Sequence, residues 1–227
     1  MLKPHFISKI KEHNVLYKPI RNIIFDLGNV IINIAPELTL RKFNEYGFAN
    51  FDEIYSIMRQ TDVFDRLDTG KITLTEFRNA IRDVSKLNLS DSQIDDAWCA
   101  MLLDFPEENA ELLRKLRAEG YKLYLLSNTN EMHIDYYTKY LKQHFGSDLL
   151  SELFDRTFYS HEIGYRKPNS EAFDYALKAE GLKPAETLFI DDLEHNVIGA
   201  RKLGIQAYLH RKGDRLVDLF VMLPDEM

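Results

Sequence analysis

Acidic and polar residues stand directly after three short apolar runs of this chain, and a lysine follows in a loop. The groups are Asp26 after residues 23–25, Ser127 and Asn128 after residues 123–126, Asp191 and Asp192 after residues 188–190, and Lys167 before Pro168. A carboxylate can attack an electrophilic centre or bind a divalent cation, while a lysine and a hydroxyl can stabilise a developing anion. These residue types suit covalent chemistry on an anionic substrate if the fold brings them together.

The apolar runs predict buried strands. Helical apolar spacing precedes three glycines, each followed by an apolar run, at Gly120 with residues 122–126, Gly181 with 187–190 and Gly204 with 205–209. This helix and strand alternation predicts a doubly wound, Rossmann-like parallel sheet with helices on both faces, an α/β fold. Pro168 is expected to start the helix after Lys167. The carboxyl ends of parallel strands share one edge of a sheet, so the polar groups are expected to converge there.

Residues 36–104 show helical patterning without a convincing strand. Thr73 with Glu76, and Ser90 with Gln93, have the spacing of a capping box at a helix start. We therefore expect an all-helical cap domain at 36–104, inserted into a core formed by residues 20–35 and 105–227. Residues 1–19 lack the apolar segment of an export signal and are interpreted as an N-terminal extension.

The polar groups, taken in order, resemble the four motifs of the haloacid dehalogenase superfamily over about residues 20–209. Asp26 matches the nucleophile motif, Ser127 the second, Lys167 the third and Asp191 with Asp192 the fourth. The strings FDLGNV, LSNTN, GYRKP and FIDD are more narrowly similar to a bacterial subgroup that includes an α-D-glucose-1-phosphate phosphatase. The helical insert after the first motif matches the position of a cap in that superfamily.

The resemblance implies Mg²⁺-dependent hydrolysis of a small phosphomonoester, a sugar phosphate, through an aspartyl-phosphate on Asp26. The implied metal ligands are Asp26, Asp192 and the carbonyl of Gly28, with Asp191 supporting them rather than binding the ion. Ser127 and the backbone N–H groups around Asn128 are expected to hold the phosphoryl oxygens. Lys167 is expected to neutralise charge between nucleophile and phosphoryl group.

One position departs from the family pattern, in which most phosphatases carry a second aspartate two residues after the nucleophile. Here that residue is Gly28. A general acid contributes roughly 10²- to 10⁴-fold in rate, so its absence affects poor leaving groups most. Either the substrate has a good leaving group, such as the anomeric oxygen of a sugar 1-phosphate, or His161 or His195 supplies the proton. Asn29 is a candidate for orienting water.

Two other functions stay open at this point. Haloacid dehalogenases attack carbon with an aspartate, need no such acid and need no metal, although they have little use for the pair Asp191 and Asp192, whose repulsion a cation relieves. A module that binds a phosphorylated ligand with little turnover is the second alternative. Phosphate release separates both from a phosphatase, and the intact Asp26 favours an enzyme over a binding module.

The composition of the chain excludes some classes of binding partner. The net charge of −7 and the pI near 5.5 argue against nucleic acid or an anionic membrane surface as a partner. Cys99 is the single cysteine, and no apolar run approaches the roughly 20 residues of a membrane span. We expect a cytoplasmic protein that acts on a small phosphorylated metabolite.

Residues 65–76 imitate a calcium-binding EF-hand loop, with Asp65 first and Glu76 twelfth. Leucine and threonine stand at the third and fifth positions, where such a loop needs oxygen ligands. We expect a turn between two cap helices with Thr73 as the N-cap, from which Arg66 or Lys71 could reach a substrate. The seven histidines show no zinc-binding spacing.

Overall fold

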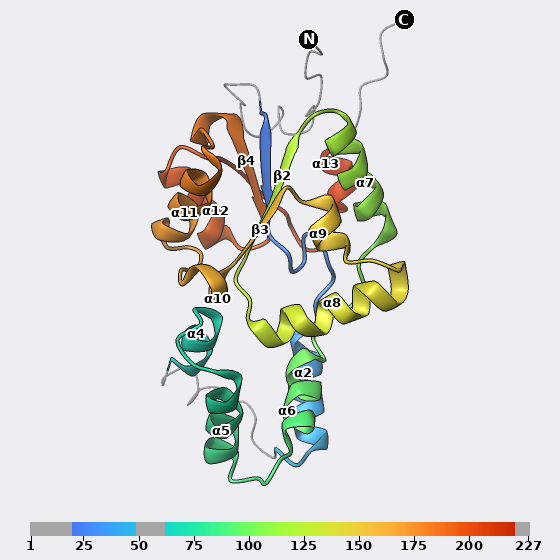
Figure 1. The fold of residues 1–227 in the computed structure, drawn as a ribbon, viewed down its shortest axis with the longest axis vertical. Coiled ribbons are helices and arrows are strands. Elements are labelled where there is room, and N and C mark those ends of the chain that lie inside the picture. Colours follow the sequence, from blue (N-terminus) through green and yellow to red (C-terminus); the bar gives the residue numbers. More distant parts are fainter. Residues whose placement is uncertain (1–19, 49–61, 221–227) are drawn as a thin grey trace, which may run out of the picture.

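The computed structural model describes residues 20–48 and 62–220. In it a parallel sheet flanked by helices forms one body, and a group of helices lies beyond one end of the strands (Figure 1). The predicted N-terminal extension lies outside the described residues, as do parts of the predicted insert and of the C-terminal end.

The sheet has five parallel strands in the order β3-β2-β1-β4-β5. The strands are β1 (Asn22–Phe25), β2 (Lys122–Ser127), β3 (Arg156–Tyr159), β4 (Thr187–Asp191) and β5 (Gln206–Leu209). The central strand β1 is buried along its whole length, and Ile24 lies between Tyr124 and Phe189 in register. Covered on both faces, such strands need continuous apolar runs. The predicted α/β fold is confirmed.

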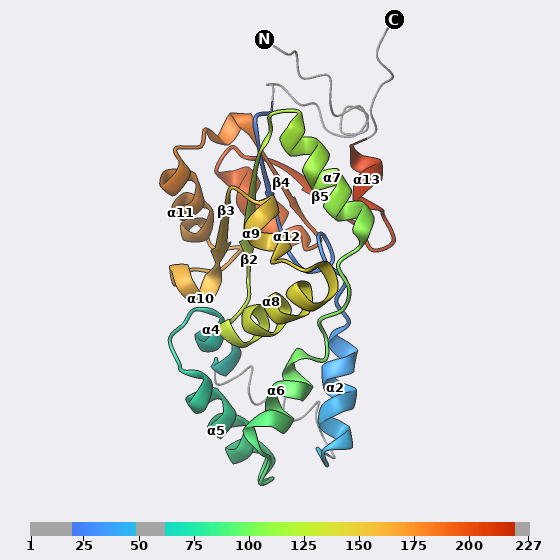
Figure 2. The same cartoon turned by 45° about the vertical axis from the view of Figure 1, so that its right-hand side comes forward.

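Helices cover both faces of the sheet (Figure 2). One face packs against α7 (Glu107–Ala118), α8 (Glu131–Phe145), α9 (Leu149–Leu153) and α13 (Leu216–Leu219), whose buried residues form one core with β1 and β2. The other face packs against α11 (Ser170–Glu180) and α12 (Glu194–Lys202). Two short elements, α10 (Ser160–Ile163) and the 3-10 helix η1 (Pro184–Glu186), complete the connections.

The remaining helices gather beyond the carboxyl ends of the strands, as Figure 1 shows. They are α2 (Pro36–Glu45), α4 (Val63–Asp68), α5 (Leu74–Ser85) and α6 (Asp91–Cys99), here called the insert. The insert has its own apolar cluster around Phe43, Phe77, Ile81 and Ile94. This separate cluster agrees with an inserted domain, although the bounds 36–104 stay a prediction.

Local signals position the insert. Both expected capping boxes are present, at Thr73 before α5 and at Ser90 before α6. Residues 65–76 form the expected turn between α4 and α5 rather than a calcium loop. The chain enters and leaves the insert side by side, because Ile34 and Leu102 form an antiparallel bridge. The insert is therefore held at its base by backbone hydrogen bonds.

Two details differ from expectation. Strand β3 was not predicted, because its sequence, Arg-Thr-Phe-Tyr, is half polar and belongs to an edge strand. The expectation that Pro168 starts α11 is wrong, since that helix begins at Ser170 with Asn169 as its N-cap. Among the described helices, none combines the length and low polarity that crossing a bilayer requires.

Candidate active site

Three carboxylates meet at the carboxyl edge of the sheet. Asp26 follows β1 directly, Asp191 ends β4, and Asp192 comes next in the chain. The Asp26 backbone N–H donates to the Ile190 carbonyl at 2.9 Å, so the two strand ends stay in register. One oxygen from each carboxylate lies within 4.8 Å of the others. The predicted convergence of these residues at one edge of the sheet is thus observed.

Lys167 lies between two of these carboxylates. Its Nζ donates to Asp26 Oδ1 at 2.7 Å and to Asp191 Oδ2 at 2.7 Å, and only 2% of the residue is exposed. Burial alone would lower the pKa of Lys167, but the charges of Asp26 and Asp191 outweigh it and raise the pKa. The lysine therefore stays protonated and fixes the orientation of Asp26.

The cluster of Asp26, Asp191 and Asp192 with Lys167, here called the carboxylate cluster, holds an excess of negative charge. Burial raises the pKa of Asp26 to about 7, against the opposing pull of Lys167. Burial and the charge of Asp191 also raise the pKa of Asp192. Three carboxylates share one ammonium, and all free donors are hard oxygens, which is the donor set that Mg²⁺ prefers. These residues fit a divalent cation.

Asp191 and Asp192 differ in how they are held. Asp191 accepts from the Leu193 backbone N–H at 2.8 Å and from Asn196 Nδ2 at 3.0 and 3.1 Å, in addition to Lys167. Asp192 accepts from Asn29 Nδ2 at 3.0 Å. The oxygens of Asp191 are thus engaged by protein donors, as a supporting role would require. Asn29, a candidate for orienting water, donates its side-chain hydrogen bond to Asp192.

Asn128 has a function that its position in the sequence did not reveal. Its Oδ1 accepts from the Lys167 backbone N–H at 2.8 Å, and its Nδ2 donates to the Lys167 carbonyl at 2.8 Å. The side chain therefore clamps the backbone of Lys167 across two loops that are 39 residues apart. Ser127 is buried at the end of β2 beside this clamp.

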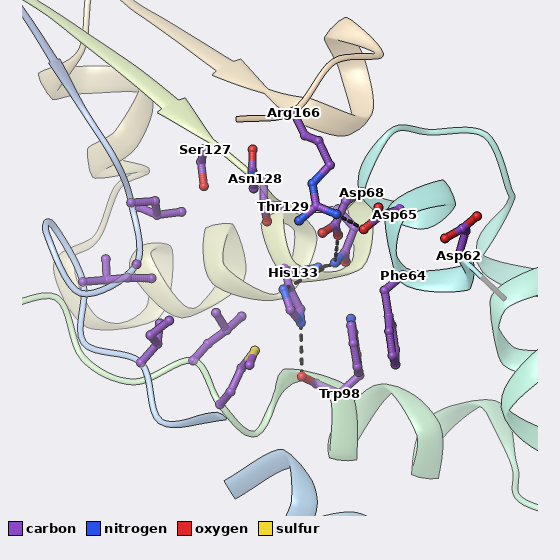
Figure 3. Close-up of a pocket in the computed structure, with 17 residues that line it drawn as sticks. Asp62, Phe64, Asp65, Asp68, Trp98, Ser127, Asn128, Thr129, His133 and Arg166 are labelled. Atoms are coloured by element: carbon purple, nitrogen blue, oxygen red, sulfur yellow. Dashed lines mark hydrogen bonds and ion pairs between the residues drawn. The ribbon is translucent and has the colours of Figure 1, made fainter. Parts of the chain in front are cut away.

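A cavity of about 510 Å³ extends from the carboxyl edge of the sheet into the insert (Figure 3). Gly28, Ser127 and Asn128 line it on the side of the sheet. Helices α4 and α6 and the start of α8 supply the opposite wall, with Asp62, Phe64, Asp65, Asp68, Trp98, Thr129, Asn130 and His133. The volume lies within the about 300–1,000 Å³ that is typical of sites for small molecules.

One part of this wall is aromatic. Trp98 stacks on Phe64 with ring centroids 5.1 Å apart and on His133 at 5.5 Å. His133 Nε2 donates to the Trp98 carbonyl at 3.1 Å, which leaves Nδ1 as an acceptor facing Asn130 Nδ2 at 3.5 Å. Burial lowers the pKa of His133 to about 4, so the ring is neutral at pH 7. The wall therefore offers flat, uncharged surface.

The rest of the wall is polar. Asp68 ends α4 and accepts a hydrogen bond from Asn130 Nδ2 at 3.2 Å. Burial raises the pKa of Asp68 to about 6 despite this donor. Arg166, from the loop before Lys167, forms an ion pair with Asp65 on α4. The cavity thus combines an aromatic face with several hydrogen-bonding groups, as Figure 3 shows.

The structure separates the other predicted candidates from the cavity. His195 is exposed on α12. The Nδ1 atom of His161 faces the Thr129 carbonyl at 3.3 Å, and His161 does not line the described cavity. Arg66 and Lys71 are exposed, and the cavity takes Arg166 instead. Sequence reasoning missed Asp68, Trp98 and His133, although Asn130 three residues before His133 is a recognisable N-cap signal for α8.

Comparison with known proteins agrees with the fold. The model of the haloacid dehalogenase-like hydrolase family matches residues 20–204. D-ribitol-5-phosphate phosphatase of Bacteroides thetaiotaomicron is 30% identical over 86% of this chain and 93% of its own length. A haloacid dehalogenase family enzyme of the same organism, solved with magnesium and inorganic phosphate, is 38% identical with a TM-score of 0.82, covering 89% of this chain and all (100%) of that one.

The chain belongs to the haloacid dehalogenase-like hydrolases, and the prediction of an enzyme of the phosphatase class of that family is confirmed. An L-2-haloacid dehalogenase of Xanthobacter autotrophicus is also similar, at 20% identity and a TM-score of 0.55, over 83% of this chain and 76% of that one. This more distant likeness shows the shared fold alone.

Proposed function

We propose that this chain hydrolyses a small phosphomonoester, a sugar or sugar alcohol phosphate, through an aspartyl-phosphate on Asp26. The observation that carries the proposal is the position of Lys167, whose Nζ lies 2.7 Å from both Asp26 and Asp191, next to a cavity of about 510 Å³ that Gly28, Ser127 and Asn128 line. A buried ammonium beside a carboxylate nucleophile neutralises the charge that repels an incoming phosphate.

Each residue of the site has a distinct part in this proposal. Asp26 attacks phosphorus and expels the leaving group, and water later cleaves the resulting acyl phosphate. Lys167 and Ser127, with the backbone N–H groups around Asn128, hold the phosphoryl oxygens. Asp26, Asp192 and the Gly28 carbonyl would hold Mg²⁺, which supplies charge neutralisation for the phosphoryl oxygens when bound.

The cavity wall supports a polyhydroxylated leaving group. The aromatic face of Phe64, Trp98 and His133 can pack against the C–H face of a polyol, while Asp68 and Arg166 can bond its hydroxyls. Trp98 Nε1 is buried and has no acceptor among the described residues. In Figure 3 this nitrogen lies at the end of the ring away from α6, on the side of Asp68. A substrate hydroxyl or a water there would satisfy it.

Two substrate hypotheses follow. The relative that acts on D-ribitol 5-phosphate favours a primary alkyl phosphate of a pentitol. The narrower resemblance to α-D-glucose-1-phosphate phosphatase favours an anomeric phosphate, which is a better leaving group. The two differ in how much a protonating group contributes, since only the alkyl ester releases a strongly basic oxygen.

Phosphate release from a substrate panel tests the proposal. The panel holds ribitol 5-phosphate, glucose 1-phosphate, other sugar phosphates and 4-nitrophenyl phosphate, each with Mg²⁺ and with a chelator. We expect release that requires Mg²⁺, from the aryl ester and from at least one polyol phosphate. Failure to release phosphate from any ester, with Mg²⁺ present, would overturn the proposal and favour a ligand-binding module or a dehalogenase.

A further inference from the structure

We propose that Asp68, at the end of helix α4 in the insert, is the general acid and base of the reaction. This inference rests on the proposed phosphatase function and adds the group that protonates the leaving oxygen. It assigns the role to the insert rather than to the sheet, where position 28 is a glycine without a side chain.

The side of the cavity formed by the sheet offers no proton donor for this step. Among the described residues that line it there, Gly28, Ser127 and Asn128 carry no group that titrates near neutral pH. Asp26 is the proposed nucleophile, and Lys167 is fixed between two carboxylates at 2.7 Å. The donor must therefore come from the opposite wall.

On the opposite wall, the described titratable residues are Asp62, Asp65, Asp68, His133 and Arg166. His133 has its Nε2–H engaged by the Trp98 carbonyl, and Arg166 is bound to Asp65 and holds its proton under all conditions of interest. Asp62 is exposed, so it keeps ordinary hydration. Among these five, Asp68 is the one carboxyl group that is partly buried, and the Asn130 amide holds it.

The surroundings of Asp68 suit a group that changes its protonation state during turnover. Burial raises its pKa to about 6, and the amide of Asn130 donates to one oxygen. The other charged or titratable groups that line the cavity are Asp62 before α4, Asp65 on α4, Arg166 in the loop and His133 on α8, and the His161 backbone of α10 lies against Gly70. A pKa near the working pH lets one carboxyl group donate and then accept a proton.

The proposed steps balance as follows. The Asp26 carboxylate attacks phosphorus, the bond from phosphorus to the leaving oxygen breaks with its electron pair on that oxygen, and Asp68 gives it a proton. Water then attacks the aspartyl-phosphate, and Asp68 takes the water's proton as the bond between phosphorus and Asp26 breaks. Asp26 recovers its carboxylate, and phosphate and the alcohol are the products.

A side chain at position 28 would require the end of the Ile34 side chain to shift. A Cβ at this position would lie 2.9 Å from Ile34 Cδ1, at the base of the insert. The same atom would lie 3.6 Å from the other two Ile34 carbons in contact, which is ordinary packing. Removing Cδ1 through Ile34→Val therefore makes room for a side chain at position 28.

The substitution Asp68→Asn tests the proposal, because it keeps the shape and the acceptor for Asn130. Steady-state rates are measured on ribitol 5-phosphate, or on the best alkyl phosphate of the panel, and on 4-nitrophenyl phosphate. We expect kcat on the alkyl ester to fall by roughly 10²- to 10⁴-fold. The kcat/KM on the aryl ester is expected to fall less than about tenfold, since nitrophenolate leaves without a proton.

The pH profile gives a second readout that a purely structural role would not change. The ratio of alkyl to aryl kcat/KM is expected to fall above pH about 6 in the unaltered protein, because Asp68 loses its proton there. In the Asp68→Asn variant this ratio should not depend on pH. Asp83→Asn is the matched control, since it removes an exposed carboxylate of α5 that does not line the cavity and should leave both rates and the ratio unchanged.

A transplanted acid tests whether the lost function is proton transfer. The triple variant Asp68→Asn, Gly28→Asp and Ile34→Val is expected to recover at least tenfold of the lost alkyl ester rate. Equal losses on alkyl and aryl esters in Asp68→Asn, or an unchanged alkyl rate, would overturn the role of Asp68. A parent protein that releases no phosphate from any ester would instead overturn the proposed function itself.

Discussion

The carboxylate cluster lies beside the cavity and the helical wall lines it, and the two are built in different ways. The cluster stands on strand ends that are paired by backbone hydrogen bonds, and protein donors hold its carboxylates at 2.7 to 3.1 Å. The wall stands on short helices, with stacked rings and a carboxyl group, Asp68, held by one amide. Bond-making groups are thus fixed by the sheet, whereas groups proposed to meet the leaving group come from the insert and from the start of α8.

This comparison predicts that changes in the cluster affect every substrate, whereas changes in the wall discriminate between substrates. Asp26→Asn is the most severe case. Turnover of both alkyl and aryl esters is expected to fall by at least about 10⁴-fold, because the nucleophile is lost while the shape is nearly kept. Phosphate release measures the loss, and circular dichroism checks the fold. Retained turnover on either ester would show that Asp26 is not the nucleophile.

Lys167→Met sharpens the comparison through stability. Two carboxylates then face each other without the ammonium, so unfolding at pH 8 without Mg²⁺ is expected to become easier by about 3–5 kcal/mol. Losing the ammonium raises the folded-state pKa of these carboxyls, so the loss should shrink as acid protonates them. Urea unfolding at pH 8 and pH 5.5 measures this.

Lys178→Met is the matched control, because this lysine is exposed on α11 and its removal should change stability by less than about 0.5 kcal/mol. A loss at Lys167 that stays equal at both pH values would contradict the charge explanation.

Two residues of the wall are expected to make the stability of the protein depend on pH. Burial lowers the folded-state pKa of His133 to about 4, so its favourable contribution is present above pH 6.5 and is lost as the pH falls through about 4. Asp68 acts in the opposite sense, because its contribution is lost as the pH rises through about 6. We expect His133→Gln to reduce the loss of stability between pH 6.5 and pH 4 by on the order of 3 kcal/mol.

Glutamine can still donate to the Trp98 carbonyl, which His133 Nε2 contacts at 3.1 Å. Denaturant unfolding across this pH range is the measurement, and Asp68→Asn serves as the comparison because it removes the opposing group. If the free energy of unfolding falls equally between pH 6.5 and pH 4 with histidine and with glutamine, His133 binds a proton as readily in the folded chain as in the unfolded one.

Trp98→Phe has the smallest expected effect and the greatest selectivity. It keeps a ring for the stack with Phe64 but removes the indole N–H that has no acceptor among the described residues. We expect KM for polyol phosphates to rise by up to about tenfold, the equivalent of one hydrogen bond, with little change for 4-nitrophenyl phosphate. A similar rise for the aryl ester would place the effect in general packing rather than in recognition of a hydroxyl.

The same division explains what the sequence could predict. Asp26 and Asp191 were predictable because a buried apolar run that stops at a charged residue marks a strand end, and parallel strand ends share one edge. Asp68 and Asn130 are 62 positions apart, and they form a hydrogen bond because the end of α4 lies against the start of α8. No local period encodes that contact, so Asp68 was read only as part of a failed calcium loop.

The sequence placed Asn128 at the site because of its backbone N–H group. The role of its side chain in holding the Lys167 backbone was not predictable, because it depends on how two loops lie relative to each other. Strand β3 was not predicted because a strand at the edge of a sheet can contain polar residues such as Arg156. Strands that are buried on both faces must be apolar, so the sequence predicts them. Contacts that depend on how separate elements dock cannot be predicted in this way.

Gly70 adds a consequence for how such a site can change over time. It lies in the turn after α4 at φ +65°, and a Cβ there would collide with the His161 backbone oxygen on α10. The residue that seats this turn against the sheet domain thus stands two positions after Asp68. Three consecutive residues, 68–70, therefore carry both a functional group and its docking contact. Because this short segment contains both, residues elsewhere in the insert can change without moving the Asp68 carboxyl group relative to the sheet domain.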